Sequence, residues 1–461
     1  MILKMIPFRG GGRMNLPEAV KNAGVVGAGG AGFPTHVKLS TTVESFIVNA
    51  AECEPLMEID KYLCRNFAEE IVAAASIVSA HLGAKRTVIA LKAKYVPEIA
   101  ALDQAIKGQG AAMEIFGMDA FYPAGDEQIM VQQVLGKIVP ERGIPKDIGV
   151  VVENVGTLLN IFDAMKGKPV KDKFLSVVGE VREPIMLHVP VGTSIKECIE
   201  KAGPTVEEYA VIIGGPMMGM VLENSAGFGA EVVTKTTGNI VVLPGKHYLA
   251  ERSHIDMKRL ATQAKSVCIQ CRFCTDMCPR HLLGHQIRPH LVMRNSFKEN
   301  FITDDAEYLR AFGDAVNCCE CNVCELYACP MGLSPRRINI HFKGKLREKG
   351  IQPERNLQPT VRQELSFRRI PTYRLAARLG LERYYGRHAH ECYELVPDTV
   401  YIPFKQHIGK PAIPLKKQGD RVKSGELLAA ADNGLSANIH ASIDGIVTAL
   451  DKNGAHIAKE A

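Results

Sequence analysis

Two cysteine motifs decide how this chain is organised: Cys268-Ile-Gln-Cys271-Arg-Phe-Cys274-Thr-Asp-Met-Cys278-Pro279, and further on Cys318-Cys319-Glu-Cys321-Asn-Val-Cys324-Glu-Leu-Tyr-Ala-Cys329-Pro330. They contain nine of the thirteen cysteines. Each motif is a C-x2-C-x2-C run, followed by a fourth cysteine that directly precedes proline. This spacing is typical of 4Fe–4S cluster ligands, because three thiolates in one tight loop can reach three irons of one cube.

The spacing also predicts which cysteines share a cluster. In two-cluster proteins the fourth cysteine of a run ligates the other cluster. We therefore predict one cluster on Cys268, Cys271, Cys274 and Cys329, and a second on Cys318, Cys321, Cys324 and Cys278. Cys319 falls outside this spacing and is interpreted as a bystander. Structural zinc and disulfides are the alternatives, but two complete sets favour clusters, and no signal peptide precedes the cysteines.

Length and composition indicate an ordinary globular protein of several domains. The chain has 461 residues, of which 46% are hydrophobic and 23% charged, enough for three or four domains with their own cores. A formal net charge of +6 gives no argument for nucleic-acid binding. The longest apolar run, around residues 71–84, is too short to span a bilayer. We expect a soluble, cytoplasmic protein.

A glycine-rich loop lies near the N-terminus, in the stretch Val25-Val-Gly-Ala-Gly-Gly-Ala-Gly-Phe-Pro-Thr-His-Val-Lys38. Its glycines formally satisfy G-x-G-x-x-G, but no long buried strand precedes them and Pro34 follows at once, so a Rossmann interpretation does not fit. Four glycines in six residues let backbone approach a flat ring or a phosphate, and Lys38 adds a cation. The alternative is a plain flexible loop.

Alternating strands and helices follow up to about residue 165. Strands are predicted at 45–50, 86–92 and 150–152, and helices at 16–22, 68–82, 95–107 and 127–134. This alternation indicates an α/β domain. Polar residues end two of its strands, in Asn49-Ala-Ala-Glu52-Cys-Glu54 and Glu153-Asn154-Val-Gly-Thr157, which is where ligand sites of such domains form.

The remaining chain divides into four further parts. Residues 166–245 read as a small α+β module with a helix near 195–202, and residues 246–345 as the cluster domain, whose halves we expect helices to join. Residues 346–400 form a linker; its stretch from Arg362 to Arg387 holds seven arginines and two glutamates. RNA or acidic-lipid binding is possible for this linker, but a solvated or domain-bridging role is favoured. Residues 401–461 are predicted to be all-β.

The first 165 residues closely resemble the NADH-oxidising, FMN-binding subunit of respiratory complex I. The glycine loop matches its G-x-G-G-A-G-F-P-x-x-x-K motif, and the two polar strand ends match its asparagine-bearing segments. The resemblance implies that FMN and NADH are bound by Gly27, Gly29, Gly30, Gly32, Phe33, Lys38, Asn49, Glu52, Glu54, Glu127, Asn154 and Thr157. Of these, Phe33 would pack on adenine, and Glu54 would lie near the nicotinamide. Lys38 and Glu54 are the residues expected to act in the reaction.

Two further modules resemble known domains. Residues 166–245 look like an SLBB domain. The C-terminal segment, with Gln406-His-Ile-Gly-Lys-Pro and His440-Ala-Ser-Ile-Asp-Gly, resembles the barrel-sandwich domain of the RnfC family. This module is lipoyl-like but lacks a Met-Lys-Met tip, so no lipoyl or biotinyl attachment is expected. The barrel-sandwich module follows the clusters here, an order similar to that of the PduS-like cobalamin reductases of bacterial microcompartments.

The expected fold class is thus multidomain α/β and α+β: a complex-I-like FMN domain (1–165), an SLBB module, a helical two-cluster ferredoxin domain and a barrel-sandwich domain. The resemblance implies that NADH reduces FMN, and that two 4Fe–4S clusters pass electrons singly to a corrinoid acceptor. Expected partners are a corrinoid protein, a microcompartment shell or an adenosyltransferase, without nucleic acid. The first alternative is an electron-transfer component of an Rnf-type assembly. The second is a non-catalytic adaptor docked on a shell.

Overall fold

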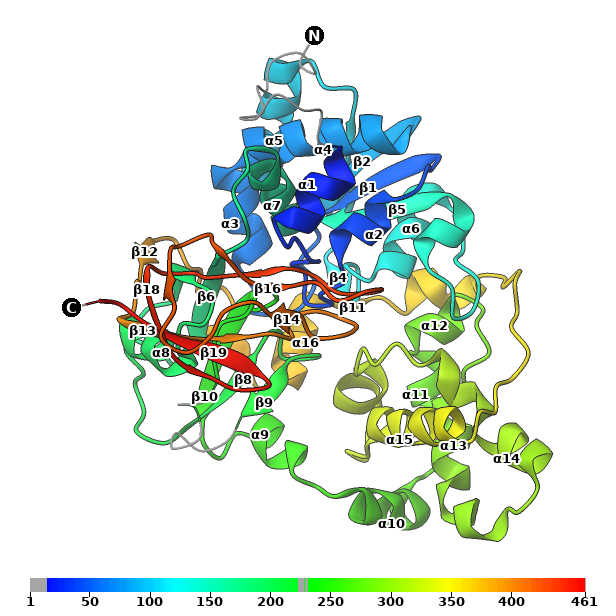
Figure 1. The fold of residues 1–461 in the computed structure, drawn as a ribbon. Helices are drawn as coiled ribbons and strands as arrows, with labels where there is room; N and C mark the ends of the chain where they lie inside the picture. The colour runs from blue at the N-terminus through cyan, green and yellow to red at the C-terminus, as the bar shows by residue number, and fades with distance from the viewer. Residues whose placement is uncertain (1–14, 223–227, 229–230, 461) are drawn as a thin grey trace.

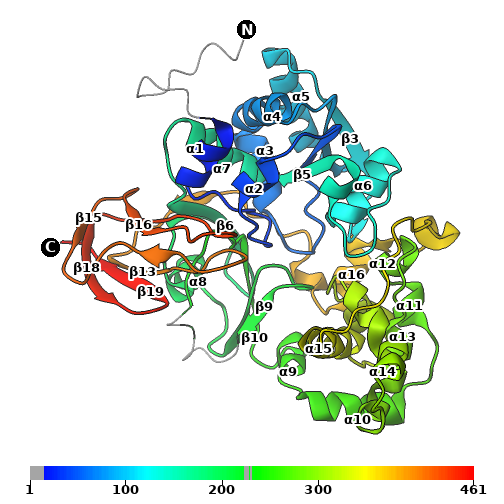
Figure 2. The ribbon, with the colours of Figure 1, turned by 45° about the vertical axis from the view of Figure 1, so that its right-hand side comes forward.

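The computed structural model describes residues 15–222, 228 and 231–460; the other residues, which include parts of the predicted first two domains, lie outside this description. Four folded units are visible (Figure 1). The blue and cyan N-terminal unit lies above, the green and the orange-to-red units lie together beneath it, and the yellow-green cysteine-rich unit lies to one side. The same grouping is seen after rotation (Figure 2).

The N-terminal unit is a parallel sheet covered by helices on both faces, which agrees with the α/β class that the sequence predicts. Its strands run in the order β3-β2-β1-β5 and all pairs are parallel. Successive residues of β1 face opposite sides: Phe46 and Val48 belong to one core and Ile47 to the other. The strands are β1 (Ser45–Asn49), β2 (Arg86–Lys92), β3 (Glu114–Met118) and β5 (Val150–Asn154). The helices are α1 (Leu16–Asn22), α2 (Thr35–Leu39), α3 (Ile59–Asn66), α4 (Ala68–Leu82), α5 (Val96–Gln109), α6 (Glu127–Leu135) and α7 (Val155–Met165).

The second unit is a mixed six-stranded sheet in the order β12-β7-β6-β10-β8-β9. One face carries α8 (Ile195–Ala202), which begins at the capping residue Ser194 and ends before Gly203. The edge strand β12 (Cys392–Glu394) comes from the linker and pairs with β7. The other strands are β6 (Asp172–Gly179), β7 (Ile185–Pro190), β8 (Tyr209–Ile213), β9 (Met220–Leu222) and β10 (Asn239–Pro244).

The cysteine-rich unit is helical, and helices rather than hairpins join its two motifs. Between Cys278 and Cys318 lie α12 (Pro279–Leu282), α13 (Pro289–Asn295), η4 (Ser296–Phe301), α14 (Asp305–Phe312) and η5 (Gly313–Asn317). The unit is completed by α9 (Tyr248–Ser253), α10 (Met257–Val267), α11 (Phe273–Asp276), η6 (Val323–Ala328) and α15 (Pro335–Glu348). No helix of the described residues is both long and apolar enough to cross a membrane.

The basic linker bridges the domains. Its β11 (Ile370–Pro371) pairs with β4 (Phe121–Tyr122), followed by α16 (Thr372–Arg378) and η8 (Glu382–Tyr384). Arg369 forms an ion pair with Asp119 of the first unit, and Arg383 pairs with Glu180 of the second. Arg378 donates to the carbonyl oxygen of Cys329 in the third. These contacts favour the domain-bridging alternative over binding of RNA or lipid.

The C-terminal unit consists of two small sheets around one apolar core, as expected for a barrel-sandwich domain. Its contact with the glycine loop is direct: the backbone N–H of Ile408 donates to the carbonyl oxygen of Gly32 at 3.0 Å. The strands are β13 (Thr399–Pro403), β14 (Ile413–Pro414), β15 (Arg421–Val422), β16 (Leu427–Ala430), β17 (Ile439–His440), β18 (Gly445–Leu450) and β19 (Gly454–Ala458).

Candidate functional site

The glycine loop closes on itself as a short hairpin. The N–H of Gly27 donates to the carbonyl of Phe33 at 2.9 Å, and the N–H of Gly32 donates to that of Gly27 at 3.2 Å. Gly30 and Gly32 have φ of +109° and +64°, a backbone conformation that residues other than glycine rarely adopt. No strand of the parallel sheet leads into this loop, so a Rossmann interpretation does not fit the structure either.

The polar end of β5 meets the glycine loop from the sheet side. The N–H of Ala28 donates to Thr157 Oγ1 at 2.9 Å, and a Cβ on Gly29 would lie 3.4 Å from that of Asn154. Asn49, on the adjacent strand β1, donates from Nδ2 to the carbonyl of Gly125 at 3.0 Å. The structure thus brings Thr157 and Asn154 to a loop more than a hundred residues earlier in the chain, and Asn49 lies beside Asn154 on the neighbouring strand.

Lys38 is surrounded by carboxylates at one end of this arrangement. Its Nζ donates to Glu127 Oε1 and to the carbonyl oxygen of Val152, both at 2.9 Å. Burial alone would lower the pKa of Lys38, but Glu153 and Glu127 outweigh it and raise that pKa to about 12. Burial raises the pKa of Glu153 to about 7. Lys38 therefore stays charged at neutral pH, while Glu153 can take up or release a proton.

The residues around the loop fit a polar, phosphate-bearing ligand such as FMN. Two buried side-chain oxygens there, Thr35 Oγ1 and Glu153 Oε1, have no hydrogen-bond partner, and buried polar atoms ordinarily have one. A Cβ on Gly30 would meet nothing within 4 Å, so space is open at that point of the loop. Unsatisfied oxygens next to a fixed cation and an open glycine backbone suit the hydroxyls and phosphate of a flavin nucleotide.

Glu52 and Glu54 lie in different environments although one residue separates them. Glu52 is buried and accepts a hydrogen bond from the N–H of Asp60 at 3.0 Å; burial raises its pKa to about 8. Glu54 accepts from the N–H of Met217 at 2.6 Å, and burial raises its pKa to about 7. Met217 belongs to the second unit. Glu54 is thus held at the junction of two domains.

The surroundings of the cysteines do not separate the two predicted sets completely. Burial raises the pKa of Cys274, with Cys329, Cys268 and Cys271 adding to the effect; burial also raises that of Cys324, with Cys318, Cys278 and Cys274 adding to it. Cys319 forms a side-chain hydrogen bond with Cys321. Among the described residues, no three His, Cys, Asp or Glu side chains form a group that could hold a single metal ion. Only Cys271 of the nine is exposed. The assignment of each cysteine to a cluster stays a prediction.

The second predicted cysteine set (Cys278, Cys318, Cys321 and Cys324) lies against the N-terminal unit, which is the predicted FMN domain and is called the flavin-type domain below. The hydroxyl of Tyr122 donates to the carbonyl oxygen of Cys321 at 2.7 Å. Arg280, two residues after Cys278, forms a buried bidentate ion pair with Asp126 at 2.7 and 2.8 Å. The pKa of Asp126 is lowered because Arg280 and two N–H groups of α6 outweigh its burial.

Among the residues of this contact, Tyr122, Asp126, Arg280 and Asn322 have no role that the sequence predicts. Asn322 adds a third link, since its Nδ2 donates to the carbonyl oxygen of Met217, whose own N–H donates to Glu54. In the sequence, the loop at 214–219 stands out only for its two methionines. No local signal connects these residues, because their partners lie between 105 and 199 positions away.

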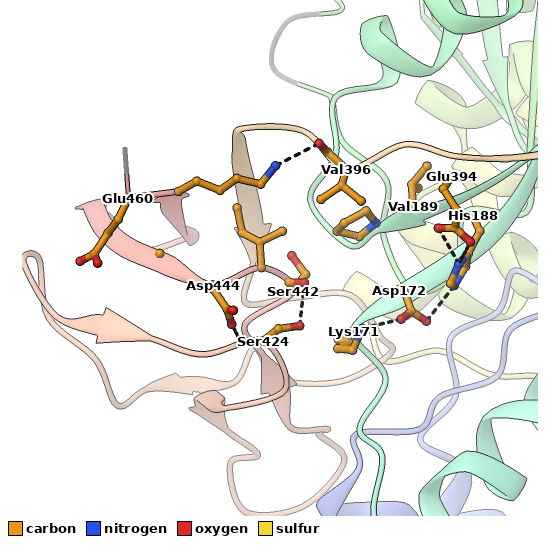
Figure 3. Close-up of a pocket in the computed structure, with 14 residues that line it drawn as sticks. Lys171, Asp172, His188, Val189, Glu394, Val396, Ser424, Ser442, Asp444 and Glu460 are labelled. Atoms are coloured by element: carbon orange, nitrogen blue, oxygen red, sulfur yellow. Dashed lines mark hydrogen bonds and ion pairs between the residues drawn. The ribbon is translucent and has the colours of Figure 1, made fainter.

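Two cavities lie beside these sites. One, of about 310 Å³, adjoins Glu54 and is lined by Lys61, Lys92, Lys94, Tyr95, Tyr385 and Arg387, among others. The other, of about 540 Å³, lies between the second unit and the C-terminal unit (Figure 3). Its His188 is held between Asp172 and Glu394, so both ring nitrogens are engaged. That imidazole therefore has no nitrogen free for a metal or a ligand.

Four family models match successive parts of the chain. The Nuo51 FMN-binding domain matches residues 20–163, the SLBB domain 174–221, the 4Fe-4S dicluster domain 267–334 and the RnfC barrel sandwich hybrid domain 390–461. These matches confirm the fold class. The chain is an oxidoreductase with an FMN-binding domain and an iron–sulfur domain.

Comparison with similar proteins identifies the family to which this oxidoreductase belongs. The chain is 41% identical to cobalamin reductase PduS of Citrobacter freundii, over 94% of each chain, and 41% identical to that of Salmonella typhimurium, over 96% of each. It is 33% identical to the C component of the ion-translocating oxidoreductase complex of Vibrio cholerae, over 60% of this chain and 34% of that one. The chain belongs to the cobalamin reductase PduS family.

Proposed function

We propose that this chain oxidises NADH at FMN and delivers the electrons singly, through two 4Fe–4S clusters, to a corrinoid acceptor, as a cobalamin reductase. The observation that carries the proposal is the direct packing of the second cysteine set on the flavin-type domain, through Tyr122–Cys321 and Asp126–Arg280. Through these buried contacts, a donor site would be joined to a one-electron relay. The family relationship supports the choice of acceptor.

FMN would be held by the glycine loop (Gly27, Gly29, Gly30, Gly32), with Asn49, Asn154 and Thr157 on the sheet side. When bound, it supplies the conversion from two-electron to one-electron chemistry that nicotinamide and iron–sulfur clusters require of an intermediate carrier. Lys38, charged at neutral pH, would stabilise negative charge on the flavin or its phosphate. Before flavin binds, Glu127 holds the ammonium group of Lys38 by a hydrogen bond and Glu153 attracts it by its charge.

NADH would bind with its nicotinamide near Glu54 and its adenine on Phe33, while Glu52 helps to shape the flavin pocket. Glu54 has a pKa of about 7, because burial outweighs the hydrogen bonds from Met217 and Met218 and the charge of Arg336. At neutral pH it is thus divided between its two protonation states. The uncharged nicotinamide of NADH can therefore bind beside a protonated Glu54, so that no buried charge has to be kept at this position.

The positions of the cysteines support an order for the two clusters. The set Cys278, Cys318, Cys321 and Cys324 contacts the flavin-type domain and would receive electrons first. The set Cys268, Cys271, Cys274 and Cys329 includes the exposed Cys271 and would pass them out of the protein. Cys319 would ligate neither cluster.

The proposal is tested by anaerobic purification followed by counts of iron, sulfide and flavin. Eight irons and one FMN per chain, with bleaching of flavin absorbance on addition of NADH and then reduction of aquocobalamin, are the results expected. A chain that binds only zinc, or a flavin that NADH never bleaches, would show the proposal to be wrong. A location in or on a microcompartment, with a shell protein or an adenosyltransferase as partner, would be tested by co-purification from cells.

A second candidate function is that of an electron-transfer component in an Rnf-type assembly. It is favoured by the barrel-sandwich match and by the similarity to the C component of the Vibrio cholerae complex. The two candidates are separated by asking whether the isolated chain turns over NADH with a corrinoid. If it turns over NADH only after partner proteins are added, the assembly role is the correct one.

A further inference from the structure

We propose that the surface around Cys271 is the docking site for an acidic protein that accepts one electron at a time. The proposal rests on the proposed function, because it assumes that a cluster lies behind Cys271. It adds the place where electrons leave the chain and the kind of partner that receives them.

Cys271 lies within an exposed apolar segment. Its neighbours Ile269 and Phe273 expose 61% and 47% of their surface to solvent, whereas Cys274, Cys278 and Cys329 are buried. Exposed large apolar side chains around a cluster ligand are not explained by folding, because they remain in contact with water. They would be covered if a partner docked over the cluster.

The apolar surface continues onto the neighbouring elements. Val267 at the end of α10 is 38% exposed, and Phe297 and Phe301 of η4 are 43% and 80% exposed. The two elements are adjacent, since Lys265 Nζ of α10 lies 5.9 Å from the ring centre of Phe297. The motif is joined to the same surface by Arg294, which donates to Gln270 Oε1 at 3.3 Å. One continuous patch therefore extends from the cysteine loop to η4.

Cations flank this patch. Five exposed cations of α10, α13 and η4 have no carboxylate in ion-pair distance among the described residues: Lys258, Arg259, Lys265, Arg294 and Lys298. Arg272 pairs weakly with Asp276 at 3.7 Å. Asp256 caps α10, and Glu299 lies 3.7 Å from both Lys345 and His341. Beyond Phe301, the start of α14 is acidic: Asp304 caps the helix, Asp305 lies 3.7 Å from Lys349, and Glu307 is exposed. The patch is thus apolar at its centre and positively charged on the side of α10 and α13, whereas its end beyond Phe301 is acidic.

This combination fits a protein with an acidic surface better than it fits a free corrinoid. The patch is built from side chains that project into solvent, and the two cavities described above lie in other parts of the molecule. Unpaired cations attract an acidic partner over a distance, and apolar side chains then hold a small, short-lived contact of the kind found in electron-transfer complexes.

The electron balance is simple. NADH gives up a hydride, becomes NAD⁺ and so supplies two electrons and releases one proton. Two molecules of the acidic partner are each reduced by one electron at this surface, one after the other. No further oxidant or reductant is required.

The test uses the cluster-loaded full chain and an acidic plant-type 2Fe–2S ferredoxin as the probe. The variant is Lys265→Glu/Arg294→Glu/Lys298→Glu. The matched control, Lys405→Glu/Lys417→Glu/Lys452→Glu, changes three exposed lysines of the C-terminal unit that form no ion pair among the described residues. Binding is measured by titration calorimetry at low and at moderate salt, and contacts are mapped by hydrogen–deuterium exchange.

The expected result is that the wild type and the control bind the ferredoxin at low salt, that salt weakens binding, and that the patch variant binds at least tenfold more weakly. Phe301→Ser should also weaken binding, with less change in its salt dependence. Equal binding by the patch variant and the wild type, equal loss in the control, or protection of residues 269–273 by aquocobalamin but not by ferredoxin would overturn the proposal. Flavin bleaching by NADH and iron content are measured separately, so a failure of the proposed function is recognised independently.

Discussion

The hydroxyl of Tyr122 donates a 2.7 Å hydrogen bond to the carbonyl oxygen of Cys321, 199 residues further along the chain. Both residues lie in one apolar core to which the linker and the second unit also contribute, through Leu375 and Met217 for example. The flavin-type domain and the second cysteine set are therefore parts of a common packed interior. If the proposed relay is correct, this common interior keeps the distance from the flavin site to the first cluster fixed.

Replacing Tyr122 with phenylalanine tests this contact. The ring should stay in the core, but the buried carbonyl of Cys321 would lose its partner, at a cost of about 1–3 kcal/mol. We expect a lower melting temperature and slower reduction of the clusters after a rapid mix with NADH, while flavin bleaching stays fast. Unchanged cluster reduction with unchanged stability would show that the hydrogen bond does not hold the two parts together. Tyr373→Phe, at an exposed tyrosine of α16, is the control.

The ion pair between Asp126 and Arg280 should contribute less to stability than its single replacements suggest. Arg280→Met leaves a buried carboxylate without its ion-pair partner, which costs about 3–5 kcal/mol. The double variant Asp126→Asn/Arg280→Met removes that charge and should recover part of the loss. Chemical unfolding of the wild type, both single variants and the double variant gives the coupling energy. Additive effects of the two replacements would show that the pair is not formed in solution.

Elements with strong local signals can be predicted from the sequence. Helix α8 has its predicted bounds because Ser194 and Gly203 cap an amphipathic segment, and α4 ends at Gly83, which adopts a left-handed conformation. The cysteine spacing and the glycine loop likewise carry their meaning within a few residues. The strand β3, with mostly half-exposed residues and a glycine, gives no comparable signal and is missing from the sequence prediction.

Contacts between domains cannot be predicted in the same way. The strand β12 has three residues and is stabilised by pairing with β7, about 200 positions away in the chain, so nothing in its own sequence marks it as a strand. Asp126 and Tyr122 lie in a segment whose sequence predicts only that a helix follows it. Their partners are defined by domain packing, which depends on complementary surfaces rather than on periodicity.

The order of the two clusters predicts different phenotypes for two cysteine replacements. Cys271→Ser should lose the outer cluster, with about half of the iron, yet NADH should still reduce the flavin and the inner cluster. Cys321→Ser should lose the inner cluster and leave the outer one intact but no longer reducible by NADH. Iron counts and electron paramagnetic resonance after NADH addition distinguish the two. Reduction of the remaining cluster in Cys321→Ser would reverse the assigned order.

Lys38→Ala should lose flavin while its iron content stays unchanged, because the only change is at the glycine-loop end of the site. Glu127→Gln removes the ion-pair partner of Lys38 but keeps the ammonium group and a side-chain acceptor at position 127, so more flavin should be retained than in Lys38→Ala. Flavin released by heating and measured by fluorescence, together with iron counts, checks both variants. Full flavin content in Lys38→Ala would contradict the role proposed for this residue.

Lys235 is buried at the junction of three domains, and from its burial we predict that the free energy of unfolding depends on pH. Its Nζ donates to the carbonyls of Gly24 and Asn438 at 2.7 and 2.6 Å, and its own N–H donates to Gln406 Oε1 at 2.9 Å. Burial lowers the pKa of this lysine from 10.5 to about 7, and no carboxylate among the described residues forms an ion pair with it. Between these two pH values the unfolded chain binds more protons at this position than the folded chain does.

The free energy of unfolding should therefore rise with pH across this interval, and this contribution is lost as the pH falls towards 7. From pH 7 to pH 9 the expected gain is about 2 kcal/mol relative to Lys235→Met, which cannot titrate. Melting curves of both proteins at several pH values give the difference, and Lys417→Met, at an exposed lysine, should follow the wild type. A difference between the wild type and Lys235→Met that does not change with pH would mean that Lys235 stays protonated in the folded protein and that water reaches this junction.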